Sequence, residues 1–441
     1  MYFFESKRII SCLTALLLLS VFSFSALAEH DLPAGRTKET GAAERVVSFP
    51  NEPFDFSEAD RLFADGVKGI NILPAETDYL SLGNKAKGDA NGDGRIDTSD
   101  ALLALRASVG IVSSDISLEY MCAVNEDGYV SSEDALQILK RTIGIINEFN
   151  VVDGSSYRVT DPYTNYTYAK LDKEIKAVAV RYHEAISLSS IGTTSGGKNL
   201  YLLRLGKGSK KVLYVGTMHG SEHINTAFLM RMAERYAYCY LAQRLFNGRD
   251  VYKLLNEYTI YIVPMINPDG ADKAINEGIS WKANGNGVDL NDNFPTSRWK
   301  DLNNGVTAPG RKDYKGPSAA SEKETKALIK LCNENRFEFA ISFHTKGQVI
   351  YWIDSLTKEV LGAKALTQKV VNSTGYKAVG TTTNVNDYAG GFENWFREAY
   401  SKPGLCVETT PSNGTTAPHD NAKFDSLIWS KASNVGLDVL S

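Results

Sequence analysis

One stretch of this sequence decides its fold: Val212-Leu-Tyr-Val-Gly-Thr-Met-His219-Gly-Ser-Glu222-His-Ile224. Its apolar run, residues 212–215, predicts a buried strand that ends at Gly216. Apolar residues then recur with helical spacing over residues 224–244, which predicts a helix with one apolar side. His219 and Glu222 therefore stand at a strand-to-helix corner. In open α/β sheets, ligands bind at these carboxyl ends of strands.

Two further apolar stretches also end at or near a histidine or a glutamate. Residues 338–344 form an apolar run that ends in His344, and residues 404–410 form another that ends near Glu408. Two His and one Glu are the three protein ligands of a catalytic zinc whose fourth position is open to water. Glu408 would be the base that such a water needs. The alternative for Glu408 is a purely structural role, a salt bridge at a strand end.

In this order, the His-x-x-Glu pair, the distal His and the distal Glu resemble the zinc carboxypeptidase family. The resemblance covers roughly residues 155–441 and includes Ile266-Asn-Pro-Asp-Gly270 and Gly287-Val-Asp-Leu-Asn291. It implies one Zn²⁺ bound by His219, Glu222 and His344, with Glu408 as the catalytic base. We expect His223 to lie outside the ligand set, because two adjacent ligands would strain the geometry.

The rest of this region alternates strands and helices, which predicts an α/β sheet with helices on both faces. The resemblance implies a mixed, mostly eight-stranded sheet. The expected strands are 187–191, 199–205, 212–215, 259–265, 339–343, 349–353 and 405–408, and the expected helices are 171–185, 224–244, 321–334, 360–371 and 424–439.

The substrate side departs from the family pattern. Carboxypeptidases of the family use Asn-Arg to bind the terminal carboxylate of the substrate, and here Asn291 is followed by Asp292. A carboxylate repels a carboxylate, so an ammonium group would suit Asp292 better. Its structural alternative is a helix cap or a surface charge. The strings Trp281 to Pro295 and Phe343 to Trp352 resemble the γ-D-glutamyl-diaminopimelate endopeptidases of the family, which cut peptidoglycan stem peptides.

Two more residues are candidates through the resemblance. The family places an Arg before the Val-Asp-x-Asn motif to stabilise the oxyanion, and Lys282 is the nearest cation here, unless it is a solvated surface lysine. Residues 387–396 match the family segment whose Tyr lies on a mobile loop over the substrate. Tyr388 would then contact substrate, with Gly390-Gly391 as a hinge, although an aromatic loop residue is also common as packing.

Residues 86–147 contain an internal repeat. In the first copy, oxygen ligands occupy loop positions 1, 3, 5, 9 and 12 of a calcium loop, with Gly94 at position 6 for the sharp turn. These ligands are Asp89, Asn91, Asp93, Asp97 and Asp100. A helical stretch follows each copy, and position 12 is Asp instead of the Glu of an EF-hand. Two such halves resemble a small all-α type I dockerin, which implies a cohesin module of a scaffold protein as its partner.

The second copy keeps fewer ligands. Asn125, Asp127 and Asp134 remain, but Ala123 stands at position 1 and Ser131 at position 9. We expect weak or absent Ca²⁺ there, and a pair of Asx-type turns is the alternative for both loops. Loop positions 10 and 11 help dockerins select a cohesin. They are Thr98-Ser99 in the first copy and Ser132-Glu133 in the second, which suggests a single binding face.

Composition limits the other classes. The chain has 441 residues, a net charge of −4 and 23% charged residues, which gives no sign of nucleic-acid binding. Residues 1–28 resemble a secretory signal whose apolar block is too short for a comfortable membrane span, so we expect a secreted, extracellular or scaffold-bound protein without a transmembrane segment. Residues 29–85 are interpreted as a linker or accessory segment. The four cysteines left after the signal are expected to be buried thiols.

The sequence thus predicts a secreted zinc metallopeptidase that carries a dockerin, with peptidoglycan stem peptides as substrate. Two alternatives stay open at this point. The first is an exocarboxypeptidase that acts on ordinary peptides, and the second is a scaffold-borne binding module without catalysis.

Overall fold

The computed structural model describes residues 86–112, 116–125, 130–149, 159–412 and 418–441. The predicted signal, the predicted linker and Asp127 of the second repeat lie outside these residues.

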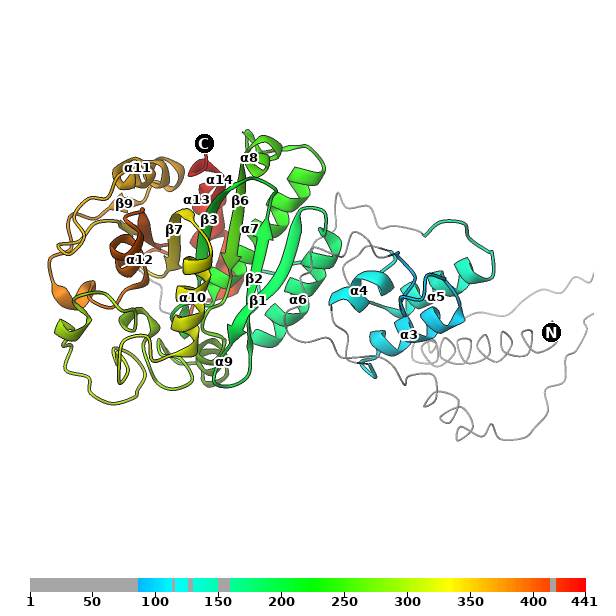
Figure 1. Cartoon of the computed structure of the whole chain (residues 1–441), viewed down its shortest axis with the longest axis horizontal. Helices are drawn as coiled ribbons and strands as arrows, with labels where there is room; N and C mark the ends of the chain where they lie inside the picture. Colours follow the sequence, from blue (N-terminus) through cyan, green and yellow to red (C-terminus); the bar gives the residue numbers. More distant parts are fainter. Residues whose placement is uncertain (1–85, 113–115, 126–129, 150–158, 413–417) are drawn as a thin grey trace, which may run out of the picture. The chain divides into compact units, whose positions relative to one another are not determined.

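Residues 159–441 are organised around one mixed sheet of eight strands in the order β1-β2-β6-β3-β7-β10-β8-β9 (Figure 1). The strands are β1 (Ile186–Thr193), β2 (Asn199–Leu205), β3 (Lys210–Gly216), β6 (Tyr258–Val263), β7 (Phe337–His344), β8 (Val349–Tyr351), β9 (Lys377–Ala378) and β10 (Gly404–Glu408). The four central strands β6, β3, β7 and β10 are parallel, whereas β1, β2 and β8 introduce antiparallel pairs. The predicted fold class is confirmed.

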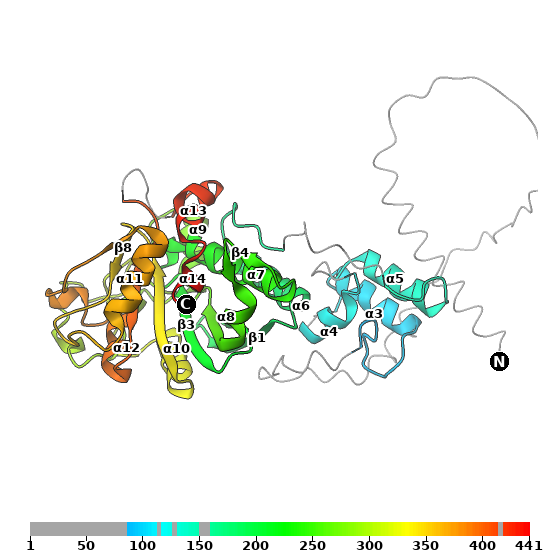
Figure 2. The ribbon, with the colours of Figure 1, turned by 90° about the horizontal axis from the view of Figure 1, so that it is seen from above.

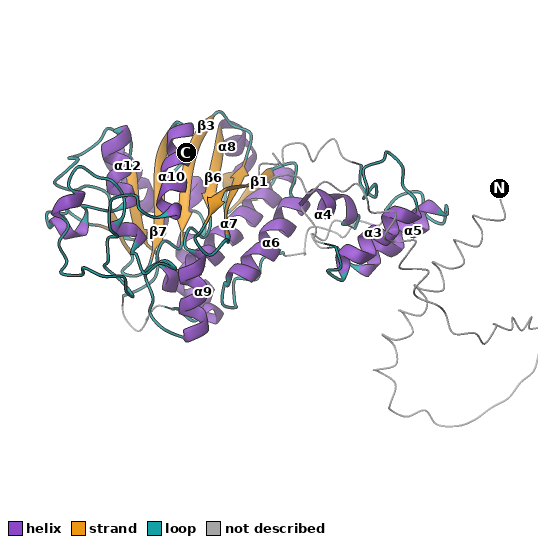
Figure 3. Cartoon of the chain, turned by 60° about the horizontal axis from the view of Figure 1, so that its bottom comes forward, coloured by secondary structure: helices purple, strands orange, loops and turns teal. Residues whose placement is uncertain are grey.

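Helices cover both faces of this sheet (Figure 3). They are α6 (Tyr168–Arg181), α7 (Ile224–Leu241), α8 (Val251–Glu257), α9 (Pro268–Glu277), α10 (Lys323–Glu334), α11 (Ala363–Thr374), α12 (Phe392–Tyr400), α13 (Ser430–Ala432) and α14 (Val435–Asp438). A short hairpin, β4 (Leu245–Phe246) and β5 (Arg249–Asp250), connects α7 to α8.

Alternate residues of the central strands enter two separate cores, as the period of two in a strand requires. Val212 and Tyr214 of β3 pack in the core that includes α6 and α7. Leu213 and Val215 pack in the core that includes α10 and α12. Because β3 is buried on both faces, it reads as a continuous apolar run in the sequence.

The C-terminal stretch differs from its prediction. Residues 424–439 were expected to form one helix, but they form a π-helical turn, Asp425–Trp429, followed by the short helices α13 and α14. Likewise α11 begins at Ala363, directly after Gly362 in a left-handed conformation, and not at residue 360.

The repeat region, seen in cyan in Figure 2, contains α3 (Thr98–Ser108), α4 (Ile116–Cys122) and α5 (Ser132–Thr142). Helices α3 and α5, one from each repeat copy, pack against each other. Among all described residues, no helix combines the length and the apolar character that crossing a bilayer would need. Cys122, Cys239, Cys332 and Cys406 are free and buried, as predicted.

Candidate metal centre and active site

Strand topology explains why distant residues meet. Strands β3, β7 and β10 are parallel neighbours, so their carboxyl ends lie at one edge of the sheet. The register pairs Glu408 with His344 and Gly216 with Phe343. His219 follows β3 by three residues and leads into the 3-10 turn η2 (Gly220–Glu222). The side chains predicted from three separate stretches therefore start from adjacent strand ends.

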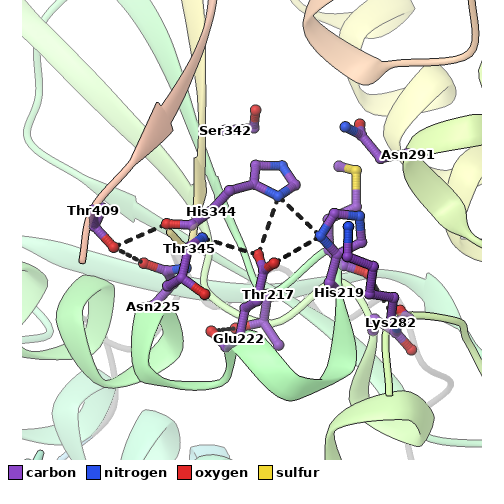
Figure 4. Close-up of polar contacts among 12 residues, drawn as sticks. Thr217, His219, Glu222, Asn225, Lys282, Asn291, Ser342, His344, Thr345 and Thr409 are labelled. Atoms are coloured by element: carbon purple, nitrogen blue, oxygen red, sulfur yellow. Dashed lines mark hydrogen bonds and ion pairs between the residues drawn. The ribbon is translucent and has the colours of Figure 1, made fainter. Parts of the chain in front are cut away.

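The three predicted ligands converge, as Figure 4 shows. Nδ1 of His219 lies 2.9 Å from Oε1 of Glu222, and Nδ1 of His344 lies 3.2 Å from Oε2 of the same carboxylate. The two Nδ1 atoms are 3.3 Å apart, and all three side chains are buried. Two imidazoles and one carboxylate, with ligand atoms within 4.8 Å of one another, fit the donor set of a catalytic zinc.

The charge of this cluster also suits a cation. Burial by itself lowers the pKa of His219, but Glu222 and Asp289 outweigh it and raise that pKa to about 10. Burial acts in the opposite direction on Glu222, whose pKa is nevertheless lowered by His219 and His344. The carboxylates of the site thus favour a positive charge beside them, which a proton on His219 can provide. A divalent cation would supply this charge in place of the proton.

Asp289 is a functional candidate that the sequence analysis missed. Its Oδ1 lies 3.3 Å from Nε2 of His219, so it holds the second ring nitrogen while Nδ1 faces the ligand cluster. The same carboxylate accepts hydrogen bonds from the backbone N–H groups of Asn291 and Asp313, each at 3.2 Å. A carboxylate behind a histidine ligand fixes its tautomer and orientation. The position of Asp289 within the Gly287 to Asn291 motif could have indicated its role, but that motif was used only as a mark of the family resemblance.

Glu408 lies beside the cluster, and its role as the base stays a prediction. Its Oε2 is buried and has no hydrogen-bond partner among the residues that the structure describes. Burial raises the pKa of Glu408 well above its usual value, and the negative charge of Glu222 raises it further. Lys282 lies alongside His219 (Figure 4), and its ammonium interacts with Asp289, Glu222 and Glu408. These carboxylates raise the pKa of Lys282 against the effect of burial, so its charge is maintained.

The substrate side forms a second acidic group. Carboxylate oxygens of Asp289, Asp292 and Asp313 lie within 4.8 Å of one another. Burial raises the pKa of Asp292 well above its usual value, and Asp289 adds to this effect. Oδ1 of Asn291 accepts a hydrogen bond from the backbone N–H of Phe392 at 3.0 Å and so anchors the start of α12, while contact of Asn291 with substrate stays a prediction.

The segment that carries Tyr388 is fastened to the Asp292 segment. The backbone N–H of Phe294 donates to the carbonyl of Gly390 at 2.9 Å, and the hydroxyl of Thr296 donates to the carbonyl of Ala389. A Cβ at Gly390 would lie 2.4 Å from the carbonyl oxygen of Asp292, so this glycine serves close backbone approach. The structure therefore offers close packing as the reason for Gly390, where we expected a hinge. Tyr388 itself is buried, and its contact with substrate stays a prediction.

The Ile266 to Gly270 motif braces the ligand turn. Nδ2 of Asn267 donates to the carbonyls of Met218, Lys282 and Ala283 at 3.0 to 3.2 Å. This amide ties the segment before the ligand turn to the segment of Lys282. His223 lies outside the ligand group: it is fully buried, and within the described part of the chain neither ring nitrogen has a hydrogen-bond partner. Burial, with His419 nearby, lowers the pKa of His223 to about 4, so it is neutral.

In the repeat region, the two loops share one pattern of hydrogen bonds. Oδ1 of Asp100 accepts from the N–H of Asn91 at 3.0 Å, and Oδ2 accepts from the N–H of Asp97 at 2.8 Å. Asp134 repeats both bonds with Asn125 at 3.0 Å and Ser131 at 2.9 Å. The two copies therefore close their loops in the same way.

The first loop gathers additional carboxylates. Asp89 accepts from the N–H groups of Asp93 and Gly94 at 3.0 and 2.9 Å, which turns both its oxygens into the loop. Burial raises the pKa of Asp100, and the nearby charges of Asp97 and Asp89 raise it further. In the second loop, Ser131 donates its hydroxyl to Asp134 at 2.7 Å and Ala123 supplies no oxygen from its side chain.

A buried His-Glu-His cluster with a free carboxylate at the edge of a mixed α/β sheet defines a metal-dependent hydrolase. Comparison with known proteins specifies the class. The family model described as zinc carboxypeptidase matches residues 171–420, which is more than half of the chain. This chain belongs to the zinc carboxypeptidase family and is a zinc metallopeptidase.

Two bacterial relatives are similar over most of the same region. Gamma-D-glutamyl-L-diamino acid endopeptidase 1 of Lysinibacillus sphaericus is 29% identical over 62% of this chain and 72% of its own length. The protein YqgT of Bacillus subtilis is 31% identical over 55% of this chain and 69% of its own.

Solved structures show the same fold. Thrombin activatable fibrinolysis inhibitor aligns with a TM-score of 0.55 at 20% identity, over 65% of this chain and 77% of that one. Carboxypeptidase A of Helicoverpa armigera aligns with a TM-score of 0.51 at 16% identity, over 71% and 81%.

Proposed function

We propose that this peptidase hydrolyses the bond between γ-D-glutamate and diaminopimelate in peptidoglycan stem peptides. The observation that carries the proposal is the acidic group of Asp289, Asp292 and Asp313 next to the metal centre. These carboxylates repel a free terminal carboxylate and attract an ammonium group. Diaminopimelate carries a second amino group, which has the charge that this surface accepts. The name of the Lysinibacillus relative, an endopeptidase for a γ-D-glutamyl bond to a diamino acid, supports the same substrate class.

The electrostatic environment explains how an ammonium would be selected. Burial and the neighbouring Asp289 disfavour the charged form of Asp292 in the free protein. An ammonium group placed beside Asp292 would lower its pKa and form an ion pair with its carboxylate. A terminal carboxylate would add a further negative charge to the same place. The site would therefore prefer an ammonium group to a terminal carboxylate for two reasons: it attracts the first and repels the second.

The residues of the site have distinct roles in this proposal. Zinc held by His219, Glu222 and His344 would polarise the scissile carbonyl and lower the pKa of bound water toward about 7. Glu408, with its unpartnered Oε2, would accept a proton and return it to the leaving amine. The ammonium of Lys282 would stabilise negative charge that develops on the carbonyl oxygen. Asp289 would keep His219 in its ligand orientation.

The test compares two substrates and two variants. Wild-type enzyme should cleave a stem peptide that contains diaminopimelate and leave a hippuryl-type carboxypeptidase substrate nearly intact. Asp292→Arg should reduce cleavage of the stem peptide by at least about tenfold, and the neutral control Asp292→Asn should reduce it less. Mass spectrometry of digested muropeptides identifies the bond. Preferential cleavage of the hippuryl substrate would favour the exocarboxypeptidase alternative.

The non-catalytic alternative has its own test. A zinc-lacking binding module would contain no zinc on metal analysis and would show no hydrolysis in either the wild type or Glu408→Gln. A metallopeptidase should show hydrolysis that the substitution removes.

We also propose that residues 86–147 are a dockerin that attaches the enzyme to a cohesin module of a scaffold protein. The repeated hydrogen bonds around Asp100 and Asp134 support a duplicated loop-helix unit. We propose one Ca²⁺ in the first loop, bound by Asp89, Asn91, Asp93, Asp97 and Asp100. The second loop lacks the oxygen of position 1, so Asn125, Asp127 and Asp134 would bind Ca²⁺ weakly. Secretion through residues 1–28 would place the enzyme where such scaffolds occur.

Binding to a panel of type I cohesin modules tests this attachment. Binding should require Ca²⁺ and should fall when Thr98-Ser99 is replaced by Ser-Glu. The matched control replaces Ser132-Glu133 by Thr-Ser and should bind normally if only the first copy forms the binding face. Binding to no cohesin in the presence of Ca²⁺ would reject the attachment.

A further inference from the structure

The segment of residues 282–293 carries most of the substrate-side chemistry and has little regular structure. It contains Lys282, Asp289, Asn291 and Asp292, with only the 3-10 turn η3 (Leu290–Asp292) between them. It also touches the ligand turn, because the carbonyl of Lys282 accepts from the N–H of Gly220 at 3.2 Å. Something outside this segment must fix its path if the side chains are to keep their places.

Asn284 closes the first turn of this segment. Its Oδ1 accepts from the N–H groups of Asn286 and Val288 at 3.0 and 3.1 Å, and its own N–H donates to the carbonyl of Val288 at 2.8 Å. Its Nδ2 is then left to donate outward, to Oε2 of Glu322 at 2.8 Å. Both side chains are buried, Asn284 with no exposed surface and Glu322 with 5%.

Glu322 binds both ends of the segment. Its Oε2 accepts from Nδ2 of Asn286 at 2.7 Å as well as from Asn284. Its backbone N–H donates to Oδ1 of Asn293 at 3.3 Å, and its Oε1 accepts from the hydroxyl of Ser321 at 2.7 Å. That hydroxyl in turn accepts from Nδ2 of Asn293 at 3.0 Å. One residue at the N-cap of α10 therefore connects residues 284 and 286 with residue 293.

Glu324 in the same helical turn provides a natural contrast. It is 1% exposed, and its Oε1 is 3.4 Å from Nδ2 of Asn284, while its Oε2 has no hydrogen-bond partner in residues 86–112, 116–125, 130–149, 159–412 and 418–441. Burial, together with the negative charges of Glu322 and Asp269, raises the pKa of Glu324 to about 7. Asp269 is itself paired with Lys198 at 3.1 Å. Only Glu322 has the short contacts with donor groups that a carboxylate requires.

We propose that Glu322 is a positioning residue for the peptidase reaction: it holds Asn284, Asn286 and Asn293 and so fixes the segment that carries Lys282, Asp289 and Asp292. An amide in place of this carboxylate would face the two amide donors in one of two ways. It would present either its NH₂ group, which cannot accept a hydrogen bond, or its carbonyl oxygen, which is a weaker acceptor than a carboxylate. The segment would then loosen without loss of any group that touches substrate or metal. Because small displacements of positioned groups reduce rates strongly, the effect should appear mainly in kcat. The proposal rests on the peptidase activity of the family and not on the stem-peptide substrate.

The experiment compares Glu322→Gln with Glu324→Gln, which makes the same change two residues further along the same helix turn. Glu322→Gln should lower kcat by about tenfold or more with less than about threefold change in KM, while zinc content stays at the wild-type value. Amide hydrogen exchange of residues 282–293 should become faster in the absence of substrate. Glu324→Gln should change kcat and exchange by less than about twofold at pH 6, where Glu324 is already mostly protonated.

A second variant keeps the proposal testable if Glu322→Gln fails to fold. Asn286→Ala removes one of the two amide donors at an exposed position, and it should raise exchange in residues 282–293 and lower kcat by a smaller factor. The proposal is overturned if Glu322→Gln leaves kcat and exchange unchanged, or if Glu322→Gln and Glu324→Gln give equal effects. It is also overturned if Asn286→Ala has no effect on exchange. Because exchange and zinc content need no substrate, this outcome is separable from failure of the proposed substrate.

Discussion

The metal centre and the first repeat loop are both candidate cation sites, but the chain builds them in opposite ways. The metal centre takes His219, Glu222 and His344 from the region of separate strand ends. His344 follows the other two residues by 122 or more positions in the sequence. The first loop takes all its ligands from residues 89–100. A local loop needs only the right spacing and one sharp turn, whereas the metal centre needs a completed sheet. Changes in the surrounding fold should therefore affect the metal centre much more than the loop.

The largest effect should come from Glu408, which depends on the alignment of β10 with β7. Glu408→Gln should reduce peptide hydrolysis by about 10² to 10⁴-fold, because it removes the proton acceptor beside the metal ligands. Zinc content and Ca²⁺ binding should stay at wild-type values. Steady-state hydrolysis with metal analysis measures both quantities, and full activity in Glu408→Gln would remove this residue from the chemistry.

A smaller effect is expected behind the metal ligands. Asp289→Asn weakens the contact at Nε2 of His219 and should lower zinc affinity by about 10 to 100-fold. Competition with a chromophoric chelator measures this affinity. The control is Asp292→Asn, which alters the neighbouring carboxylate without direct contact to His219 and should leave affinity within about threefold. Equal losses in the two variants would show that total charge, and not the contact with His219, decides affinity.

The repeat loop should respond independently of the peptidase. Asp89→Ala removes the carboxylate that accepts from Asp93 and Gly94, and it should abolish high-affinity Ca²⁺ binding. Asp134→Ala should have a weaker effect on Ca²⁺, because the second loop already lacks a ligand at position 1. Isothermal titration with Ca²⁺ measures both. Hydrolysis by either variant should match the wild type, and a joint loss would contradict the separation of the two regions.

The smallest effect concerns stability and pH. The pKa of Glu324 is about 7 in the folded protein and near 4.5 when unfolded, so the native state retains the proton as pH rises from about 4.5 to 7. Its contribution to stability is therefore fully present below about pH 4.5 and is lost as pH rises through about 7. The difference is on the order of 3 kcal/mol. Melting temperature against pH should fall more for the wild type than for Glu324→Gln, and parallel curves would contradict this assignment.

The comparison also explains what could be predicted from the sequence. The strands that end in His344 and Glu408 could be recognised because parallel buried strands read as continuous apolar runs. Asp289 had a signal in the Gly287 to Asn291 motif, but the Glu322 network had none, because its partners are set by the path of residues 282–293, which follows no period. The hinge expected at Gly390 was inferred from the family resemblance and the Gly390-Gly391 pair, whereas the close approach of Gly390 to Asp292 depends on a distant segment. Regular elements were predictable, and irregular segments that meet in three dimensions were not.

Zinc and calcium content of the purified full chain tests the central claim most directly, measured in the wild type, His344→Ala and Asp89→Ala. The wild type should contain one zinc and one tightly bound calcium per chain. His344→Ala should lose zinc and keep calcium, and Asp89→Ala should do the reverse. Zinc retained at full occupancy in His344→Ala, or lost in Asp89→Ala, would contradict the assignment of the two sites.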